Sequence, residues 1–179
     1  IYRTYLQAED IAVGEHAVDF VLGRDPDYLE SHWPDTSPLQ VFQQNFIIFK
    51  DLDNNDVYLE YHDYTANNPL QPPVGLSRYL NRIGKAVLQK YATEPDFSQF
   101  TQPEPSMVHG ALLDTGLGVS GIIFYQGIPY SVTCLPIIGN RASWEPAGVL
   151  FLGSELNNEY FKTLTHYRSS TFELLNYYD

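Results

Sequence analysis

The stretch that decides the fold reads GVSGIIFYQGIPYSVTCLPII from Gly118 to Ile138 and, after a polar loop, AGVLFLGSEL from Ala147 to Leu156. Gln126-Gly127 interrupts the first apolar run with a pair that tolerates the positive φ of a tight hairpin turn. Pro136 cannot donate a ladder hydrogen bond and helps to end the second strand. The pattern predicts three antiparallel strands and then a helix that begins at Leu156, and it carries no obvious catalytic group.

A second hairpin is predicted upstream. Asn45–Lys50 is an apolar strand, Asp51–Asp56 is a turn of acidic and amide residues, and Val57–His62 is the partner strand. Between the two sets of strands, apolar residues recur every three or four positions, which predicts an amphipathic helix over residues 76–92. The residues of this stripe are Leu76, Leu80, Ile83, Val87 and Tyr91.

The ends of the chain are predicted to be helical. Residues 1–22 show helical spacing that Gly23 ends, and a short second helix follows, with Asp25 as its cap and Pro26 at its first position. Pro34 and Pro38 are expected to bound a loop. Two further polar, proline-containing stretches, 63–75 and 93–106, also read as loops, and Thr171–Tyr177 reads as a final strand.

The predicted fold class is α+β, with a PAS-like (Cache-like) five-stranded antiparallel sheet. Such a sheet requires sequential hairpins and one helical crossover between its second and third strands, which is the order found here. We expect a single domain over residues 1–179. Its parts are a long N-terminal helix (1–22), a PAS-like core (40–155) and a C-terminal helix (156–167).

Composition excludes several classes of function. The net charge of −12 repels nucleic acid and an anionic membrane surface. Cys134 is the only cysteine, so neither an intrachain disulfide nor a cysteine-type zinc site can form. The 14 tyrosines suit either a polar-lined cavity or an ordinary core and surface. No apolar run is long enough to span a bilayer, and the chain reads as a domain excised from a longer protein.

Polar side chains in two places suggest chemistry. Tyr58, Glu60 and His62 alternate along one strand and share a face, where they could contact a ligand, act as acid and base, contribute to a metal site, or form a plain hydrogen-bonded surface. Arg78, Arg82 and Lys85 share one helical face, which suits either an anion site or a solvated surface.

Other motifs are incomplete. The acidic turn at Asp51–Asp56 begins like a calcium loop, but Asp56 and His62 occupy the positions that require glycine and glutamate, so a hairpin turn is the better interpretation. Ser120 lacks the second glycine of a nucleophile elbow, because Ile122 stands there.

Several segments together resemble the CHASE-type extracytoplasmic sensory domains, fourth subclass. The segments are DFVLGRDPDYLESHW (19–33), NFIIFKDLDNN (45–55), VSGII (119–123), GIPYSVTCLPI (127–137) and GVLFLG (148–153). The resemblance implies a Cache-like periplasmic sensor that sits between two membrane helices of a bacterial or archaeal receptor. The cytoplasmic output of such receptors is usually a diguanylate cyclase, a c-di-GMP phosphodiesterase or a histidine kinase.

One segment departs from the family pattern. Relatives commonly carry a Trp-Asp-Asp-Thr-Tyr-like run just before the position of Phe20, whereas this chain has GEHAV at 14–18. Glu15 keeps an acid but the aromatic positions are lost, so the identity of a relative's ligand is not carried over to this chain.

The resemblance and the residues together predict a ligand-sensing domain with no catalysis of its own. A small molecule is expected between the sheet and residues 63–106, with Tyr79 and Arg82 closing the site. The strand residues expected to line it are Tyr58, Glu60, His62, Tyr125, Ser131 and Thr133. Binding is expected to shift the helices at 1–22 and 156–167 relative to each other.

The expected partners follow from the same interpretation. They are an unidentified small molecule, membrane helices that anchor the parent protein, and a second copy that pairs through the first helix. Neither a cofactor nor a metal nor a nucleic acid is expected. The alternatives are a ligand-free PAS-like interaction module and, more remotely, an enzyme built on Glu60 and His62.

Overall fold

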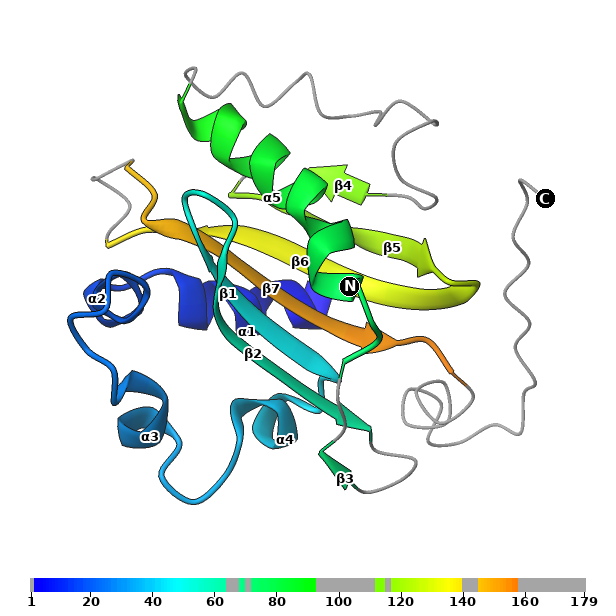
Figure 1. Cartoon of the computed structure of the whole chain (residues 1–179), viewed down its shortest axis with the longest axis horizontal. Helices are drawn as coiled ribbons and strands as arrows, with labels where there is room; N and C mark the ends of the chain where they lie inside the picture. The colour runs from blue at the N-terminus through cyan, green and yellow to red at the C-terminus, as the bar shows by residue number, and fades with distance from the viewer. Residues whose placement is uncertain are drawn as a thin grey trace.

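The computed structural model describes residues 2–63, 68–69, 72–92, 112–114, 117–139 and 145–157. Figure 1 shows the sheet with α5 in front of it and α1 behind it. The helices are α1 (Tyr2–Ala12), α2 (Glu15–Val21), α3 (Tyr28–His32), α4 (Pro38–Phe42) and α5 (Leu76–Ala92). The strands are β1 (Phe46–Asp51), β2 (Asp56–Asp63), β3 (Asn68–Pro69), β4 (Leu112–Asp114), β5 (Val119–Tyr125), β6 (Ile128–Ile137) and β7 (Gly148–Glu155).

Five long antiparallel strands form the body of the sheet, in the order β2-β1-β7-β6-β5. This confirms the predicted α+β class and the predicted antiparallel sheet of five strands. Within the described ranges, the short strands β3 and β4 extend its two edges to seven strands. Both are too short to leave a period in the sequence. The strand predicted at Thr171–Tyr177 lies outside the described residues.

Both hairpin turns follow the predicted chemistry. Gln126 and Gly127 have φ angles of 53° and 78°, which is the left-handed pair that a two-residue hairpin needs. In the first hairpin, Asn54 takes φ 63°. The Asp51 carboxylate accepts hydrogen bonds from the backbone N–H groups of Asp53 (2.9 Å) and Asn55 (2.8 Å), which holds the turn closed.

The long N-terminal helix predicted for residues 1–22 is wrong. The helix breaks after Ala12, because the backbone there pairs with the end of β6 instead. Ile138 N–H donates to the carbonyl of Ala12 (3.1 Å), and Gly14 N–H donates to the carbonyl of Ile138 (2.9 Å). These tertiary hydrogen bonds replace those of a continuous helix at a glycine, the residue type that supports a helix least after proline.

Three other predicted boundaries also change. The short helix α3 begins at Tyr28 rather than beside Asp25 and Pro26. The segment expected to be a loop contains α4, which Ser37 caps by accepting a hydrogen bond from Leu39 N–H (3.1 Å). Leu156 continues the β ladder by donating to the Pro129 carbonyl (2.8 Å), so a helix does not begin there; the rest of the predicted helix 156–167 is outside the described residues beyond Asn157.

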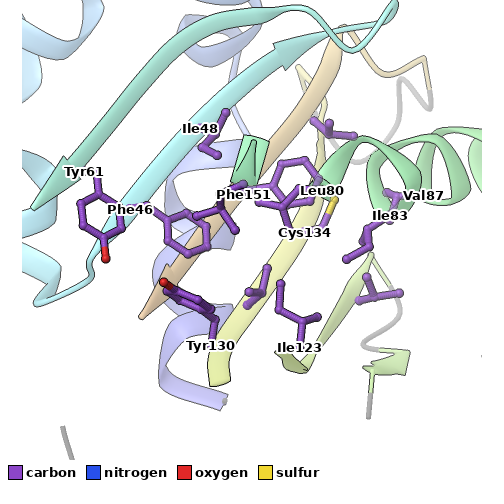
Figure 2. Close-up of a cluster of buried hydrophobic side chains, with 14 residues drawn as sticks. Phe46, Ile48, Tyr61, Leu80, Ile83, Val87, Ile123, Tyr130, Cys134 and Phe151 are labelled. Atoms are coloured by element: carbon purple, nitrogen blue, oxygen red, sulfur yellow. The ribbon is translucent and has the colours of Figure 1, made fainter. Parts of the chain in front are cut away.

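Each face of the sheet carries its own hydrophobic core. We call the side covered by α5 the α5 face and the side covered by α1–α4 the N-terminal face. The helix predicted at 76–92 is confirmed as α5, and it turns its apolar stripe onto the α5 face. Figure 2 shows Leu80, Ile83 and Val87 of this helix beside Ile123, Cys134 and Phe151 of the sheet.

The alternation of β1 divides its side chains between the two cores. Phe46 and Ile48 lie on the α5 face, whereas Ile47 and Phe49 lie on the N-terminal face.

Among the described residues, no helix has both the length and the apolarity that crossing a membrane requires.

Candidate functional site

A polar pocket of about 450 Å³ opens beside the tip of the β1–β2 hairpin and the first two turns of α5. We call it the hairpin pocket. It is lined by Lys50, Asn54, Asn55, Asp56, Val74, Gly75, Ser77, Arg78 and Asn81. Its volume lies in the range of small-molecule sites in proteins, roughly 300 to 1,000 Å³.

Lys50 is the buried charge of this pocket. Strand alternation turns it toward α5, and its side chain is only 1% exposed. A bulge in the β1–β2 pairing shifts the register by one residue, so that Asp56 rather than Val57 stands opposite Lys50. The Lys50 ammonium donates to the Asp56 carboxylate, which is how a protein accommodates a charge that it removes from water.

Ser77, in the first turn of α5, completes a closed cluster with this ion pair. Its hydroxyl donates to the two Asp56 carboxylate oxygens (2.6 and 2.8 Å) and accepts from the Lys50 ammonium (2.6 Å). The Lys50–Asp56–Ser77 cluster therefore ties the hairpin to the helix. A ligand that reached these groups would alter the contact between the two elements.

Two amide oxygens and one cation of the pocket have no partner among the described residues. The Oδ1 atoms of Asn54 and Asn81 are buried and accept no hydrogen bond. Arg78 is exposed and pairs with no described acid. Because Lys50 and Asp56 balance each other, Arg78 leaves the described lining with one net positive charge.

Gly84 makes room for Asn54. A Cβ at Gly84 would lie 2.7 Å from the Asn54 Oδ1 and 3.2 Å from Val149. The tip of the hairpin can therefore press its amide against α5 only where the helix has no side chain.

The predicted strand residues of β2 lie on the N-terminal face, away from this pocket. The Tyr58 hydroxyl donates to Glu60 Oε2 (2.8 Å), and its ring meets Phe20 and Phe49 edge-on. Burial and the hydrogen bond to Glu60 raise the pKa of Tyr58. His62 is buried, and its backbone N–H donates to the Asn45 carbonyl (2.7 Å).

Ser131 and Thr133 also lie on the N-terminal face, buried beneath α1. Thr133 shares a hydrogen bond with Ser120 (2.7 Å), so Ser120 is a core hydroxyl. The Ser131 hydroxyl is buried and has no hydrogen-bond partner.

The remaining predicted residues belong to the α5 side. The rings of Tyr79 and Tyr125 lie 5.0 Å apart, and the Tyr79 hydroxyl donates to the Phe124 carbonyl (3.2 Å). Burial raises the pKa of Tyr79 even though Arg82 lowers it. Arg82 is exposed on α5. The sheet thus separates the eight predicted residues into two groups that do not line one cavity, and ligand contact by each of them stays a prediction.

The sequence predicts only some of the residues that line the hairpin pocket. Arg78 was recognised in its basic group, of which Arg82 and Lys85 lie outside the pocket lining. Lys50 has one sequence signal, because it continues the alternation of FIIFK on the side that faces the core. The roles of Asn54, Ser77 and Asn81 depend on contacts between distant segments, which a sequence pattern does not reveal.

A second buried polar group joins α1 to the sheet on the N-terminal face. Gln44 donates to Gln7 of α1 (3.0 Å), and Ser154 of β7 donates to Gln44 (2.8 Å). Gln44 and Ser154 are buried and Gln7 is half-buried, and these hydrogen bonds link the three side chains. They locate α1 on the sheet.

The metal-ligating side chains of the described part of the chain are scattered, and Cys134 lies in the core. Its His, Cys, Asp and Glu side chains form no group of three or more placed to hold a metal ion. Cys134 is fully buried, and burial raises the pKa of its thiol well above the usual value, which suits a core residue.

No curated protein matches the sequence. The family model of the CHASE4 domain matches residues 3–175, nearly the whole chain. Because the match covers nearly all of its residues, the chain belongs to the CHASE4 family of extracellular sensory domains.

Proposed function

We propose that this chain is the ligand-sensing domain of a membrane-bound receptor and that it binds a small molecule in the hairpin pocket. Membership of a sensory family supports the first part. The observation that carries the second is the meeting of the hairpin and α5 around unpartnered polar groups. In this proposal the domain senses and does not catalyse. It lies in the periplasm, and flanking helices anchor the parent protein in the membrane.

The sheet is of the PAS or Cache type in this proposal. The strand order β2-β1-β7-β6-β5, with α5 between the two hairpins, supports it. The ligand then lies on the side of the crossover helix, as expected from the sequence, although nearer the hairpin tip than the centre of the sheet.

The signal leaves through α1. Ligand binding changes how α5 and the hairpin contact each other, and both pack on the strands that carry α1. A small difference in affinity for two arrangements of these elements biases their equilibrium. From the resemblance to receptors we also propose that the cytoplasmic output domain is a diguanylate cyclase, a phosphodiesterase or a histidine kinase. We further propose that two copies of the domain pair through α1.

A thermal-shift screen with amino acids, organic acids and polyamines tests the ligand proposal. A compound that binds the folded state raises the melting temperature by mass action, by the equivalent of about 2.7 kcal/mol at a hundredfold excess over Kd. Asn81→Leu, which replaces an amide of the pocket lining by an apolar side chain of similar shape, should abolish the shift. Lys85→Leu, a turn further along α5 and outside the lining, should preserve it. A shift that survives Asn81→Leu places the ligand elsewhere.

A ligand-free interaction module is the alternative. It draws on one observation, that apolar side chains such as Leu80, Phe151 and Ile123 fill the centre of the α5 face. If this alternative holds, no compound in the screen shifts the melting temperature, and pocket substitutions change stability alone.

A further inference from the structure

We propose that His16 and His32 form a two-histidine site for a divalent transition-metal ion, Ni²⁺ or Zn²⁺, and that the bound ion ties α2 to α3. The inference goes beyond the proposed function and does not depend on the hairpin pocket. It starts from one adjacent pair among the otherwise scattered metal-ligating side chains of the described residues.

The two imidazole rings stand at the spacing that a shared metal ion requires. His16 lies on α2 and His32 on α3, and the two helices contact each other (Figure 1). The ring centres are 5.4 Å apart, and the ring planes are inclined by 60°. Metal–nitrogen bonds of about 2.0–2.1 Å, at bond angles between about 90° and 180°, place two ligating rings with their centres roughly 4.5 to 6.3 Å apart. Rotation of the exposed side chains can therefore bring both rings to one ion while the helices stay in place.

The hydrogen bonds of His32 leave one ring nitrogen free to bind a metal. Its Nδ1 lies 3.0 Å from the Tyr28 carbonyl oxygen and 3.1 Å from the Ser31 hydroxyl. A carbonyl can only accept, and the Ser31 hydroxyl donates to that same carbonyl (2.9 Å), so both contacts place the proton on Nδ1. Nε2 then carries the lone pair. Metal-ligating histidines commonly donate their other ring nitrogen to a backbone carbonyl in this way.

Neighbouring rings hold His32 in position. Its ring centre lies 4.5 Å from that of Tyr28 and 5.8 Å from that of Trp33. Tyr28 is itself buried, with its ring 5.5 Å from Phe20 of α2. His32 is thus the fixed ligand, whereas the side chain of His16 is 71% exposed and is the one that turns to complete the pair.

The surrounding charges favour a cation. The Asp25 carboxylate lies 3.8 Å from His16 Nδ1 and adds a negative charge beside the pair. Arg24, the basic residue of the connection between α2 and α3, pairs with Asp19 (3.3 Å) and so does not offset that charge. Imidazole nitrogen suits Ni²⁺ and Zn²⁺, whereas Mg²⁺ prefers oxygen ligands. With two protein ligands, water completes the coordination of the ion.

Calorimetric titration of the 179-residue chain with Ni²⁺, Zn²⁺ and Mg²⁺ tests the site. Ni²⁺ and Zn²⁺ should each bind to one site that needs both histidines, and Mg²⁺ should not compete for it. His16→Gln and His32→Gln should each weaken this binding by at least about tenfold, since loss of even an outer partner of a ligand commonly costs 10- to 100-fold. Glu30→Gln, which removes an exposed acid of α3, is the control and should leave binding unchanged.

The tie between the two helices gives a second measurement. Saturating Ni²⁺ should raise the melting temperature of the unmodified chain by mass action and should raise that of neither histidine variant. Binding that either variant retains at full strength overturns the shared site. Equal binding of Mg²⁺ assigns the affinity to acidic oxygen ligands instead, and a lack of binding by both Ni²⁺ and Zn²⁺ overturns the proposal as a whole.

Discussion

The two faces of the sheet are both covered by helices, but they hold their polar groups differently. On the α5 face the centre is apolar, and the polar groups gather at the hairpin end, where the pocket opens to solvent. On the N-terminal face the polar groups are enclosed beneath α1, where Gln7, Gln44 and Ser154 bond to one another. The hydrogen-bonded groups under α1 fix the position of that helix, whereas the exposed Arg78 at the open end of the α5 face pairs with no described acid and is accessible to a ligand.

The apolar centre of the α5 face should show the largest effect on stability. Phe151→Ala removes a fully buried ring from under α5 and should lower the free energy of unfolding by about 3–5 kcal/mol. Urea denaturation measures the change. Val74→Ala, at a side chain that is 89% exposed, is the control and should stay within about 0.5 kcal/mol. A loss below about 1 kcal/mol for Phe151→Ala would contradict a continuous core on this face.

The ion pair of the hairpin pocket should respond unequally to loss of its two partners. Asp56→Ala leaves the buried Lys50 ammonium uncompensated and should cost about 3 kcal/mol, whereas Lys50→Met leaves a carboxylate that is 40% exposed and should cost about 1 kcal/mol. Denaturant titration of both variants gives the comparison. Equal losses would mean that Lys50 reaches water in the folded state.

The contact between hairpin and helix should depend on Gly84. Gly84→Ala drives a methyl group against Asn54 and should cost about 1–2 kcal/mol, despite the better helix propensity of alanine. In an Asn54→Gly background, which keeps the positive φ at the turn, the same change should cost little. Thermal unfolding of the four chains forms a double-mutant cycle. Additive effects would rule out the contact.

On the N-terminal face, two serines on neighbouring strands should differ. Ser154→Ala breaks a hydrogen bond to Gln44 and should cost about 1 kcal/mol. Ser131→Ala removes a buried hydroxyl that has no partner, so it should be neutral or slightly stabilising. The two residues face each other across β6 and β7, which makes them a matched pair. A larger loss of stability for Ser131→Ala than for Ser154→Ala would contradict the assignment of the hydrogen bond to Ser154 and of an unpartnered hydroxyl to Ser131.

The smallest effect is expected from the turn at Asp51. Burial alone would raise the pKa of this carboxyl, but hydrogen bonds from Asn55 and Asp53 outweigh it and lower the pKa. A lowered pKa contributes stability above the unfolded value of about 3.9, and this stability is lost as the pH falls through the folded pKa. The advantage of the native chain over Asp51→Asn should therefore shrink between pH 7 and pH 3 in urea titrations. A constant difference would show that Asp51 acts through packing.

The sequence predicts the helices and strands whose apolar residues recur at regular spacing, but it does not predict the points where helices break or end. The stripe of α5 and the five long strands follow from spacing, and the Gln126-Gly127 turn follows from backbone chemistry. The break at Gly14 depends on a strand end more than a hundred residues away in the chain. The six predicted site residues on strands follow from alternation within each strand, which does not show which face a given helix covers.

Local order and composition thus sufficed for the class of the fold, its hairpins, its crossover helix and the likeness to a sensory family. Only the tertiary structure determines which polar groups come into contact. A bulge in β2 turned Asp56 toward Lys50, a glycine in α5 admitted Asn54, and the sheet kept Tyr58 apart from Tyr125. The physical reason is range: propensity and periodicity act over a few residues, whereas a pocket forms where segments distant in sequence pack together and leave some of their hydrogen-bonding groups unpaired.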